Sequence, residues 1–221
     1  MLEQQLYALR DMAEIRSLIR SHAWATLISF VPESGLVASH LPVILDPDRD
    51  DATVLGHLAR ADAEQHQLGL HSTLLVIEGP NGYISPSFYE AGPYVPTWNF
   101  LVTHLHGIPE VLNPADAYAV LEATVDHLES RRPKPWQMAT VHEYAQRIAP
   151  GVTGFRLSSS HVISKAKMSQ EKPRDVAARV IKALDSADDA HFNPALADAM
   201  SKILSIETRD HTPGREQASF G

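Results

Sequence analysis

The strongest constraint on the fold is a succession of short β-prone segments in the first half of the chain. These segments are residues 24–30, 36–45, 53–58, 73–78, 83–85 and 98–107. Clusters of Pro, Gly, Asn and Asp separate them, residues 79–82 are expected to form a turn, and Pro42 is expected to interrupt the second segment. Helical periodicity in this half is confined to residues 11–21 and 59–70. This pattern predicts a closed antiparallel barrel rather than a doubly wound parallel sheet.

Helices dominate the chain after residue 113. The expected elements are a helix with Tyr118, Leu121, Val125 and Leu128 on one face, a short helix at 142–148, a returning strand at 152–164, and two final helices around 176–184 and 196–203. The fold class is therefore α+β, with peripheral and C-terminal helices on the barrel. We expect one domain over residues 1–207 and a disordered tail over residues 208–221.

Composition narrows the function classes. The 221 residues include 19 Lys and Arg against 27 Asp and Glu, a formal net charge of −8, which argues against nucleic acid as a partner. The absence of Cys excludes disulfides, thiolate metal ligands and Cys nucleophiles. The first residues have no basic flank or long apolar run, and the longest apolar stretch is residues 73–77. We expect a cytoplasmic protein that does not enter membranes.

Histidine is the residue type most able to carry chemistry in this chain. Twelve are present, and six lie in the predicted barrel half: His40, His57, His66, His71, His104 and His106. His104 and His106 are two apart on a predicted strand, so both point to one face, as hydrogen-bonded core residues or as ligands. His66 falls inside the helix predicted at 59–70, where a histidine is usually a surface residue.

Cationic and aromatic residues add further candidates. Arg60 follows the strand that ends near His57, a setting that suits an anion but also an ordinary solvated arginine. Lys165, Lys167 and Lys172 could receive carboxylates or form a solvated charge run. The aromatic residues between positions 83 and 98 could be a packed core corner or the walls of a pocket for a flat ring.

Five strings occur in an order and spacing that resemble a known family. They are ASHLP at 38–42, GHLARA at 56–61, GP at 79–80 with YISPSFY at 83–89, VPTWNF at 95–100, and KMSQ at 167–170. Together they resemble the PaiB-like group of FMN-binding negative transcriptional regulators, over about residues 12–185. The resemblance implies an FMN-binding split β-barrel that forms a homodimer, with a cofactor near the subunit interface.

The sequence also departs from the usual PaiB-like pattern. Asp62-Ala63 and Gln65-His66 stand where that family usually has an Asn-Pro pair and a Trp. The loop after Tyr89 lacks the expected lysines, His106 replaces a usual Tyr, and Glu171 replaces a usual Asn. Because these changes add imidazoles and remove groups that would bind a flavin, the chain looks like the haem-using branch, the piperazate synthases of natural-product biosynthesis.

That branch implies a function and a set of site residues. The function is formation of the N–N bond of piperazic acid from N5-hydroxy-L-ornithine with haem b as cofactor. His66 is the expected axial iron ligand, and the other expected cofactor contacts are His57, His40, His106, Tyr83, Ser85 and Trp98. Arg60 and Lys167 would bind a propionate or the substrate carboxylate, and Tyr89 would donate a proton. The alternatives are an FMN-dependent split-barrel oxidoreductase and a DNA-binding regulator.

Overall fold

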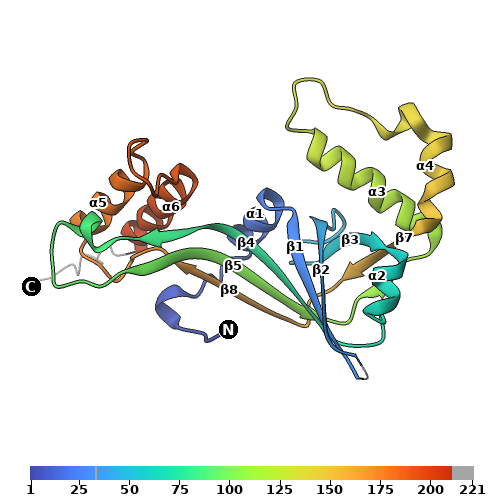
Figure 1. Ribbon diagram of the computed structural model, residues 1–221, viewed down its shortest axis with the longest axis horizontal. Helices are drawn as coiled ribbons and strands as arrows, with labels where there is room; N and C mark the ends of the chain where they lie inside the picture. Colours follow the sequence, from blue (N-terminus) through green and yellow to red (C-terminus); the bar gives the residue numbers. More distant parts are fainter. Residues whose placement is uncertain (33, 211–221) are drawn as a thin grey trace, which may run out of the picture. The chain divides into compact units, whose positions relative to one another are not determined.

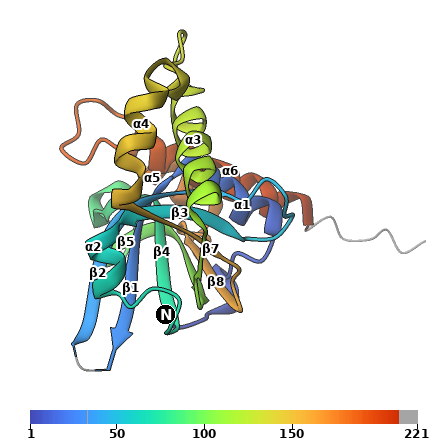
Figure 2. The same ribbon diagram turned by 90° about the vertical axis from the view of Figure 1, so that its right-hand side faces the viewer.

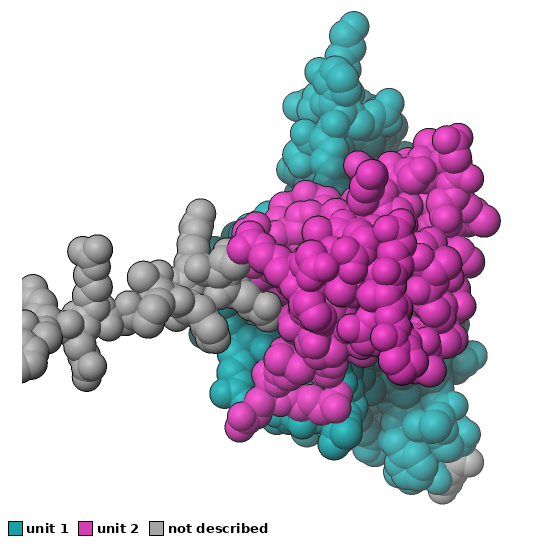
Figure 3. All heavy atoms as spheres, turned by 90° about the vertical axis from the view of Figure 1, so that its left-hand side faces the viewer, with its two compact units in different colours: residues 1–3, 8–79, 102–165 teal, residues 4–7, 80–101, 166–221 magenta. Residues whose placement is uncertain are grey.

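The computed structural model describes residues 1–32 and 34–210 (Figure 1). The chain divides into two compact units, coloured separately in Figure 3. Unit 1 comprises residues 1–3, 8–79 and 102–165, and unit 2 comprises residues 4–7, 80–101 and 166–221. Each unit is described on its own below, and the expectation of one domain over residues 1–207 stays a prediction.

Eight strands form the sheet, and their order along it is linear. The strands are β1 (Trp24–Val31), β2 (Gly35–Leu45), β3 (Val54–Ala59), β4 (Thr73–Ile84), β5 (Thr97–Gly107), β6 (Glu110–Val111), β7 (Val152–Leu157) and β8 (His161–Lys167). The order is β6-β7-β3-β2-β1-β4-β5-β8, so β6 and β8 are edges. The predicted split-barrel α+β class is confirmed, but as an open half-barrel sheet instead of a closed cylinder.

Pro42 does not interrupt β2, because it lies where that strand changes partner. Residues Gly35 to Pro42 pair antiparallel with β1, and the last pair joins Pro42 to Trp24. From Val43 to Leu45 the same strand pairs with β3 instead. A proline without an N–H is tolerated at such a switch, where one ladder ends and another begins.

Two other strand predictions were wrong. The turn expected at residues 79–82 is absent, since β4 continues from Thr73 to Ile84. Gly82 leaves room for a close neighbour there, because a Cβ at this position would lie 3.0 Å from Asn193 Nδ2 and from a methyl group of Leu196. The single strand expected at 152–164 is two strands, β7 and β8.

Six α-helices and four short 3-10 helices accompany the described part of the sheet. The α-helices are α1 (Met12–Ser21), α2 (Arg60–Gln65), α3 (Pro114–Glu129), α4 (His142–Ile148), α5 (Arg174–Leu184) and α6 (Pro194–Asp210). The 3-10 helices are η1 (Gln5–Tyr7), η2 (Pro86–Tyr89), η3 (Met138–Val141) and η4 (Ala149–Gly151). None of the described helices is long and apolar enough to cross a membrane.

Capping residues and left-handed residues set the helix limits. The side chains of Asp11 and Asn113 accept hydrogen bonds from the first turns of α1 and α3. The helix expected at 59–70 ends at Gln65, because Gln67 and Gly69 have φ angles of 44° and 89°. Of the expected tail, residues 208–210 belong to α6 and residues 211–221 lie outside the described residues.

The core of unit 1 lies on the inner face of its strands. Leu27, Leu41, Leu75, Ile77 and Phe155 are at most 1% exposed in it. On the outside of this unit, α3 and α4 lie side by side in Figures 1 and 2. The buried face of α3 consists of Ala117, Val120 and Thr124, so the stripe predicted through Tyr118 and Leu121 was one position out of register.

Unit 2 has its own packed interior. The facing sides of α5 and α6 bury Val176, Val180, Leu184, Leu196 and Met200. The 3-10 helix η2 packs against α5 and fixes the aromatic segment that begins after β4. In both units, therefore, a packed interior lies beneath the elements that carry the candidate side chains.

Candidate functional site

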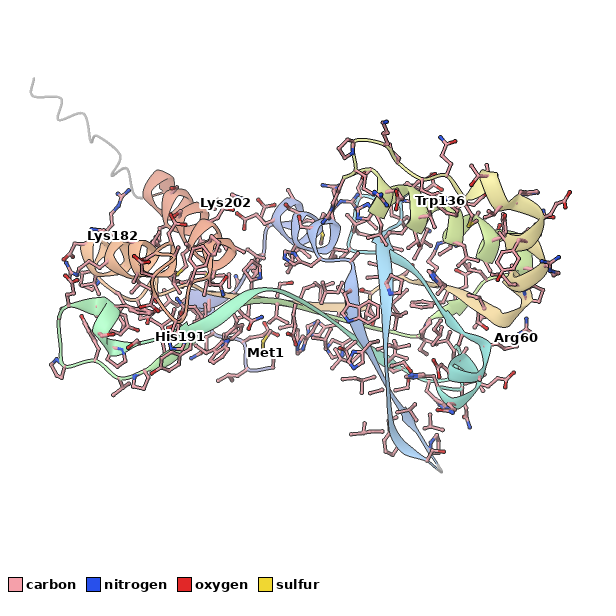
Figure 4. All side chains as sticks on the ribbon, turned by 45° about the horizontal axis from the view of Figure 1, so that its top comes forward. Met1, Arg60, Trp136, Lys182, His191 and Lys202 are labelled. Atoms are coloured by element: carbon pink, nitrogen blue, oxygen red, sulfur yellow. The ribbon has the colours of Figure 1, made fainter. Side chains whose placement is uncertain are left out.

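The structure divides the ten predicted site residues equally between the two units. Unit 1 contains His40, His57, Arg60, His66 and His106, and unit 2 contains Tyr83, Ser85, Tyr89, Trp98 and Lys167. Arg60 of unit 1 and His191 of unit 2 are labelled in Figure 4.

His66 is a buried residue, against the expectation that a histidine here lies at the surface. It follows the last residue of α2 and has 0% exposure. Its Nδ1 lies 2.8 Å from Ser29 Oγ on β1, and its Nε2 lies 3.0 Å from Ser39 Oγ on β2. A neutral imidazole has one donor and one acceptor nitrogen, so each serine satisfies one of them. An iron ligand at His66 would have to exchange one serine partner for the metal.

His57 and His106 each have a buried ring nitrogen without a hydrogen-bond partner in the described part of the chain. These atoms are His57 Nδ1 on β3 and His106 Nε2 on β5. The His106 ring lies 6.4 Å from that of His104, as their spacing predicted, and 5.7 Å from that of His161 on β8. A buried nitrogen with no partner is an incomplete contact that a ligand can complete.

Burial of these rings predicts how stability depends on pH. Desolvation lowers the pKa of His57, His66, His104 and His106 below the usual histidine value. The unfolded chain therefore takes up protons first as the pH falls. We expect the free energy of unfolding to decrease between about pH 7 and pH 5.

Urea unfolding at a series of pH values measures this dependence. His57→Gln should make the slope shallower, because it removes one buried imidazole. His142→Gln, at an exposed position away from the β1–β2 face, is the matched control and should change the slope less than His57→Gln does. A free energy of unfolding that rises on acidification would contradict the prediction.

His40 belongs to an exposed apolar face of the β1–β2 ribbon. Its Nδ1 lies 3.0 Å from Thr26 Oγ1, and its ring stacks on Trp24 at 6.4 Å with an interplanar angle of 18°. On the same face Phe30 pairs with Leu36, and Trp24, Phe30 and Leu36 are 64%, 61% and 76% exposed. Neighbouring large apolar side chains at this exposure indicate an interaction surface.

Arg60 lines a cavity within unit 1. The cavity has a volume of about 1070 Å³ and lies among α2, α3, β7 and the segment from α4 to η4. Its walls are mostly apolar, with Ala63, Leu68, Leu112 and Leu121 among them. No ion pair joins Arg60 to another described residue, so its guanidinium is available to an anion.

Tyr89 of unit 2 has a buried hydroxyl with no partner in the described residues. The residue is 0% exposed, and its ring contacts that of Tyr94 at 4.9 Å. Lys172 Nζ lies 4.4 Å from the Tyr94 ring centre, and Arg179 Nε donates to the Tyr89 carbonyl at 2.7 Å. Burial raises the pKa of Tyr89, with the nearby Glu171 acting in the same direction, so the hydroxyl keeps its proton.

Lys167 and Ser85 have structural partners of their own. Lys167 Nζ donates to Thr97 Oγ1 and, at 2.9 Å, to the Trp98 carbonyl. Ser85 Oγ accepts from Ser87 N at 3.3 Å and caps η2. Both residues therefore stabilise the aromatic segment of unit 2, residues 83–98.

Tyr83 and Trp98 line a hollow together with two residues that sequence reasoning missed. These are His191 and Phe192, from the loop between α5 and α6. About 90 residues separate them from Trp98, and no local motif marks them, so only the fold reveals the association. We call this site the aromatic hollow.

An antiparallel half-barrel sheet with flanking helices is the split-barrel fold. Comparison with known families identifies one family that matches the chain. The family model described as a putative FMN-binding domain matches residues 1–161, and the chain belongs to this PaiB-like family. Over 186 residues the chain is 22% identical to Bacillus subtilis protease synthase and sporulation protein PAI 2, covering 83% of this chain and 88% of that protein.

Solved structures agree with the fold. The flavocytochrome Anf3 from Azotobacter vinelandii has a TM-score of 0.58 at 15% identity, covering 80% of this chain and 78% of its own. The FAD- and haem-binding protein from Mycobacterium smegmatis has a TM-score of 0.56 at 12% identity, covering 77% of this chain and 78% of its own. The similarity shows that the chain has the split-barrel fold of these proteins.

Proposed function

We propose that this protein is a haem-dependent piperazate synthase that converts N5-hydroxy-L-ornithine into piperazic acid. The observation that carries the proposal is the buried imidazole of His66, which occupies a position where PaiB-like sequences usually have other residues. It lies inside unit 1, where its two ring nitrogens contact the hydroxyls of Ser29 and Ser39.

The chain's donor set fits haem. Haem needs one protein nitrogen for its iron, and the described residues include no group of three or more His, Asp or Glu that could hold a bare metal ion. His66 is the proposed ligand. His57 and His106 are the alternatives, since each of these two has a buried ring nitrogen with no partner among the described residues. Arg60, at its open cavity, is the proposed partner of a carboxylate.

The proposed reaction needs no external reductant or oxidant. The N5–O bond breaks, the α-amine nitrogen bonds to N5, and the oxygen leaves as water with the proton that the amine loses. Bound haem supplies a Lewis acid that weakens the N–O bond. Tyr89, whose buried hydroxyl keeps its proton, is the proposed acid for the leaving oxygen.

Binding and orientation are the other tasks of the protein. We propose that Arg60 in unit 1 and Lys167 in unit 2 each bind a carboxylate group, of the substrate or of the cofactor. A fixed carboxylate limits the conformations of the flexible substrate and favours those in which its two nitrogens meet. Apolar and aromatic walls would also limit water, which competes with the α-amine for N5.

Reconstitution with haemin tests the proposal. We expect about one haem per chain with a Soret band, and conversion of N5-hydroxy-L-ornithine without NAD(P)H. L-Ornithine should be inert, because it has no N–O bond. Arg60→Gln should lower kcat/KM by at least about tenfold, while Arg147→Gln, an arginine stacked on Tyr144, is the matched control. A haem-loaded protein that leaves the substrate untouched would overturn the proposal.

The second candidate function is an FMN-dependent oxidoreductase. The observation that favours it is the match to a family model described as a putative FMN-binding domain. Its signature would be stoichiometric FMN in the purified protein and substrate turnover that requires NADPH.

The family resemblance implies a homodimer, and we also propose that its interface is the exposed face around Trp24, Phe30 and Leu36. Sedimentation equilibrium should give a dimer, and Leu36→Lys should shift it to a monomer by burying a charge in the interface. Ile108→Lys, also at an exposed apolar position, is the control and should remain dimeric. A monomeric parent protein would contradict this.

A further inference from the structure

We propose that the aromatic hollow of unit 2 is a binding site for an organic ammonium ion, of the quaternary or methylated alkylammonium class. The hollow has a volume of about 630 Å³ and is lined by Gly82, Tyr83, Trp98, His191, Phe192 and Asn193. This gives Tyr83 and Trp98 a ligand other than the cofactor that the resemblance implied for them.

The ring geometry favours a compact cation over a flat ring. The Tyr83 ring lies 6.4 Å from Trp98 at an interplanar angle of 65°, and 4.9 Å from His191 at 47°. A planar ligand stacks best in a slot between parallel rings, and neither of these pairs is parallel. Rings that meet at such angles present faces to a roughly spherical group, which is how aromatic cages hold methylated ammonium ions.

Hydrogen bonds hold the Trp98 indole and the Asn193 amide of the wall. Trp98 Nε1 donates to Asn81 Oδ1 at 3.2 Å, and Asn193 Nδ2 donates to the Asn81 carbonyl at 2.9 Å. Asn193 Oδ1 accepts from the backbone N–H of Leu196 at 3.1 Å. These bonds fix the indole and the amide, and aromatic rings make up most of the remaining wall.

Local charge favours a cation. Among the residues that the structure describes, no Lys, Arg, Asp or Glu lines the hollow. The chain between Lys182 and Lys202 contains four Asp and no Lys or Arg, and this stretch supplies His191 and Phe192. Asp189 also fixes the loop, since its Oδ1 accepts from the His191 N–H at 2.7 Å. Asp198 is paired with Lys202 Nζ at 2.6 Å, and the other three Asp leave the stretch that supplies His191 and Phe192 acidic, which favours a cation over an anion as the ligand.

The site depends on residues beyond the family domain. The family model ends at residue 161, whereas His191, Phe192 and Asn193 come later in the chain. Half of the lining residues therefore come from outside the matched segment, and the hollow does not follow from membership of the family.

Calorimetry with choline and with its neutral isostere 3,3-dimethylbutan-1-ol tests the proposal on the full chain. The two probes share a shape and differ in charge. We expect saturable binding of choline, at least about fivefold tighter than the isostere, and an upfield ring-current shift of its methyl protons. Equal binding of the two probes, or no saturable binding of choline, would overturn the proposal.

Substitutions then locate the site. Trp98→Leu keeps apolar bulk but removes the π face, and should weaken choline binding by about tenfold. Phe192→Leu should weaken it in the same direction. Trp136→Leu, an exposed Trp in unit 1 (Figure 4), is the control and should bind choline as the parent does. Circular dichroism establishes that each variant is folded, and a folded Trp98→Leu with unchanged choline affinity would overturn the assignment.

Discussion

His66→Ala should lower the free energy of unfolding by about 2–4 kcal/mol. The substitution empties the space of a side chain with 0% exposure and leaves the hydroxyls of Ser29 and Ser39 without their imidazole partner. For a chain of this size, that corresponds to a fall in Tm of roughly 5–15 °C. Thermal and urea unfolding measure it.

His71→Ala is the matched control, since it removes an imidazole five residues further along. The His71 ring contacts Gln67 Oε1 at 2.7 Å in an exposed setting, so its loss should change stability by less than about 0.5 kcal/mol. Equal losses of stability for the two substitutions would contradict the burial of His66 between Ser29 and Ser39. With haemin present, His66→Ala should also remove the native Soret band. A retained band would indicate that His57 or His106 is the iron ligand instead.

Gly154→Ala should lower the free energy of unfolding by about 1–3 kcal/mol, or the Tm by roughly 3–10 °C. A Cβ on Gly154 of β7 would lie 2.8 Å from both the Cα and the Cβ of Ala117 on α3. Backbone atoms of a packed helix cannot turn aside as a flexible side chain can, so α3 would have to move off β7.

Gly151→Ala provides the control three residues away, because nothing lies within 4 Å of a Cβ built there. It should leave Tm within about 2 °C of the parent. Since Ala117 and Gly154 also line the cavity beside Arg60, Gly154→Ala should weaken any ligand held there. An unchanged Tm for Gly154→Ala would show that α3 is free to shift.

The sequence predicts strands and helices best where a single period is sustained. The strand at β1 and the helices at α1 and α5 follow from apolar alternation or three-and-four spacing. Prediction fails where tertiary contacts override a local signal. At Gly79 to Gly82 a turn-like string continues as strand, and Asn193 bonds to Asn81 within it. Pro42 does not break β2, because it lies where the ladder to β1 ends and the ladder to β3 begins.

The candidate residues show the same limit. The spacing of His104 and His106 suffices to place them together. The burial of His66 does not follow from its helix, because it depends on two serines that lie 27 and 37 residues away on neighbouring strands. The pairing of Tyr83 with His191 joins residues 108 positions apart and has no local signal at all.

The change of partner along β2 has a consequence for cooperativity. One unbroken strand supplies the ladder to β1 and then the ladder to β3. Opening either ladder frees an end of the other, so backbone amides on both sides of Pro42 should exchange with solvent hydrogen through a shared opening event. β1, β2 and β3 would thus form one foldon, and the serines that hold His66 would separate only when that foldon opens.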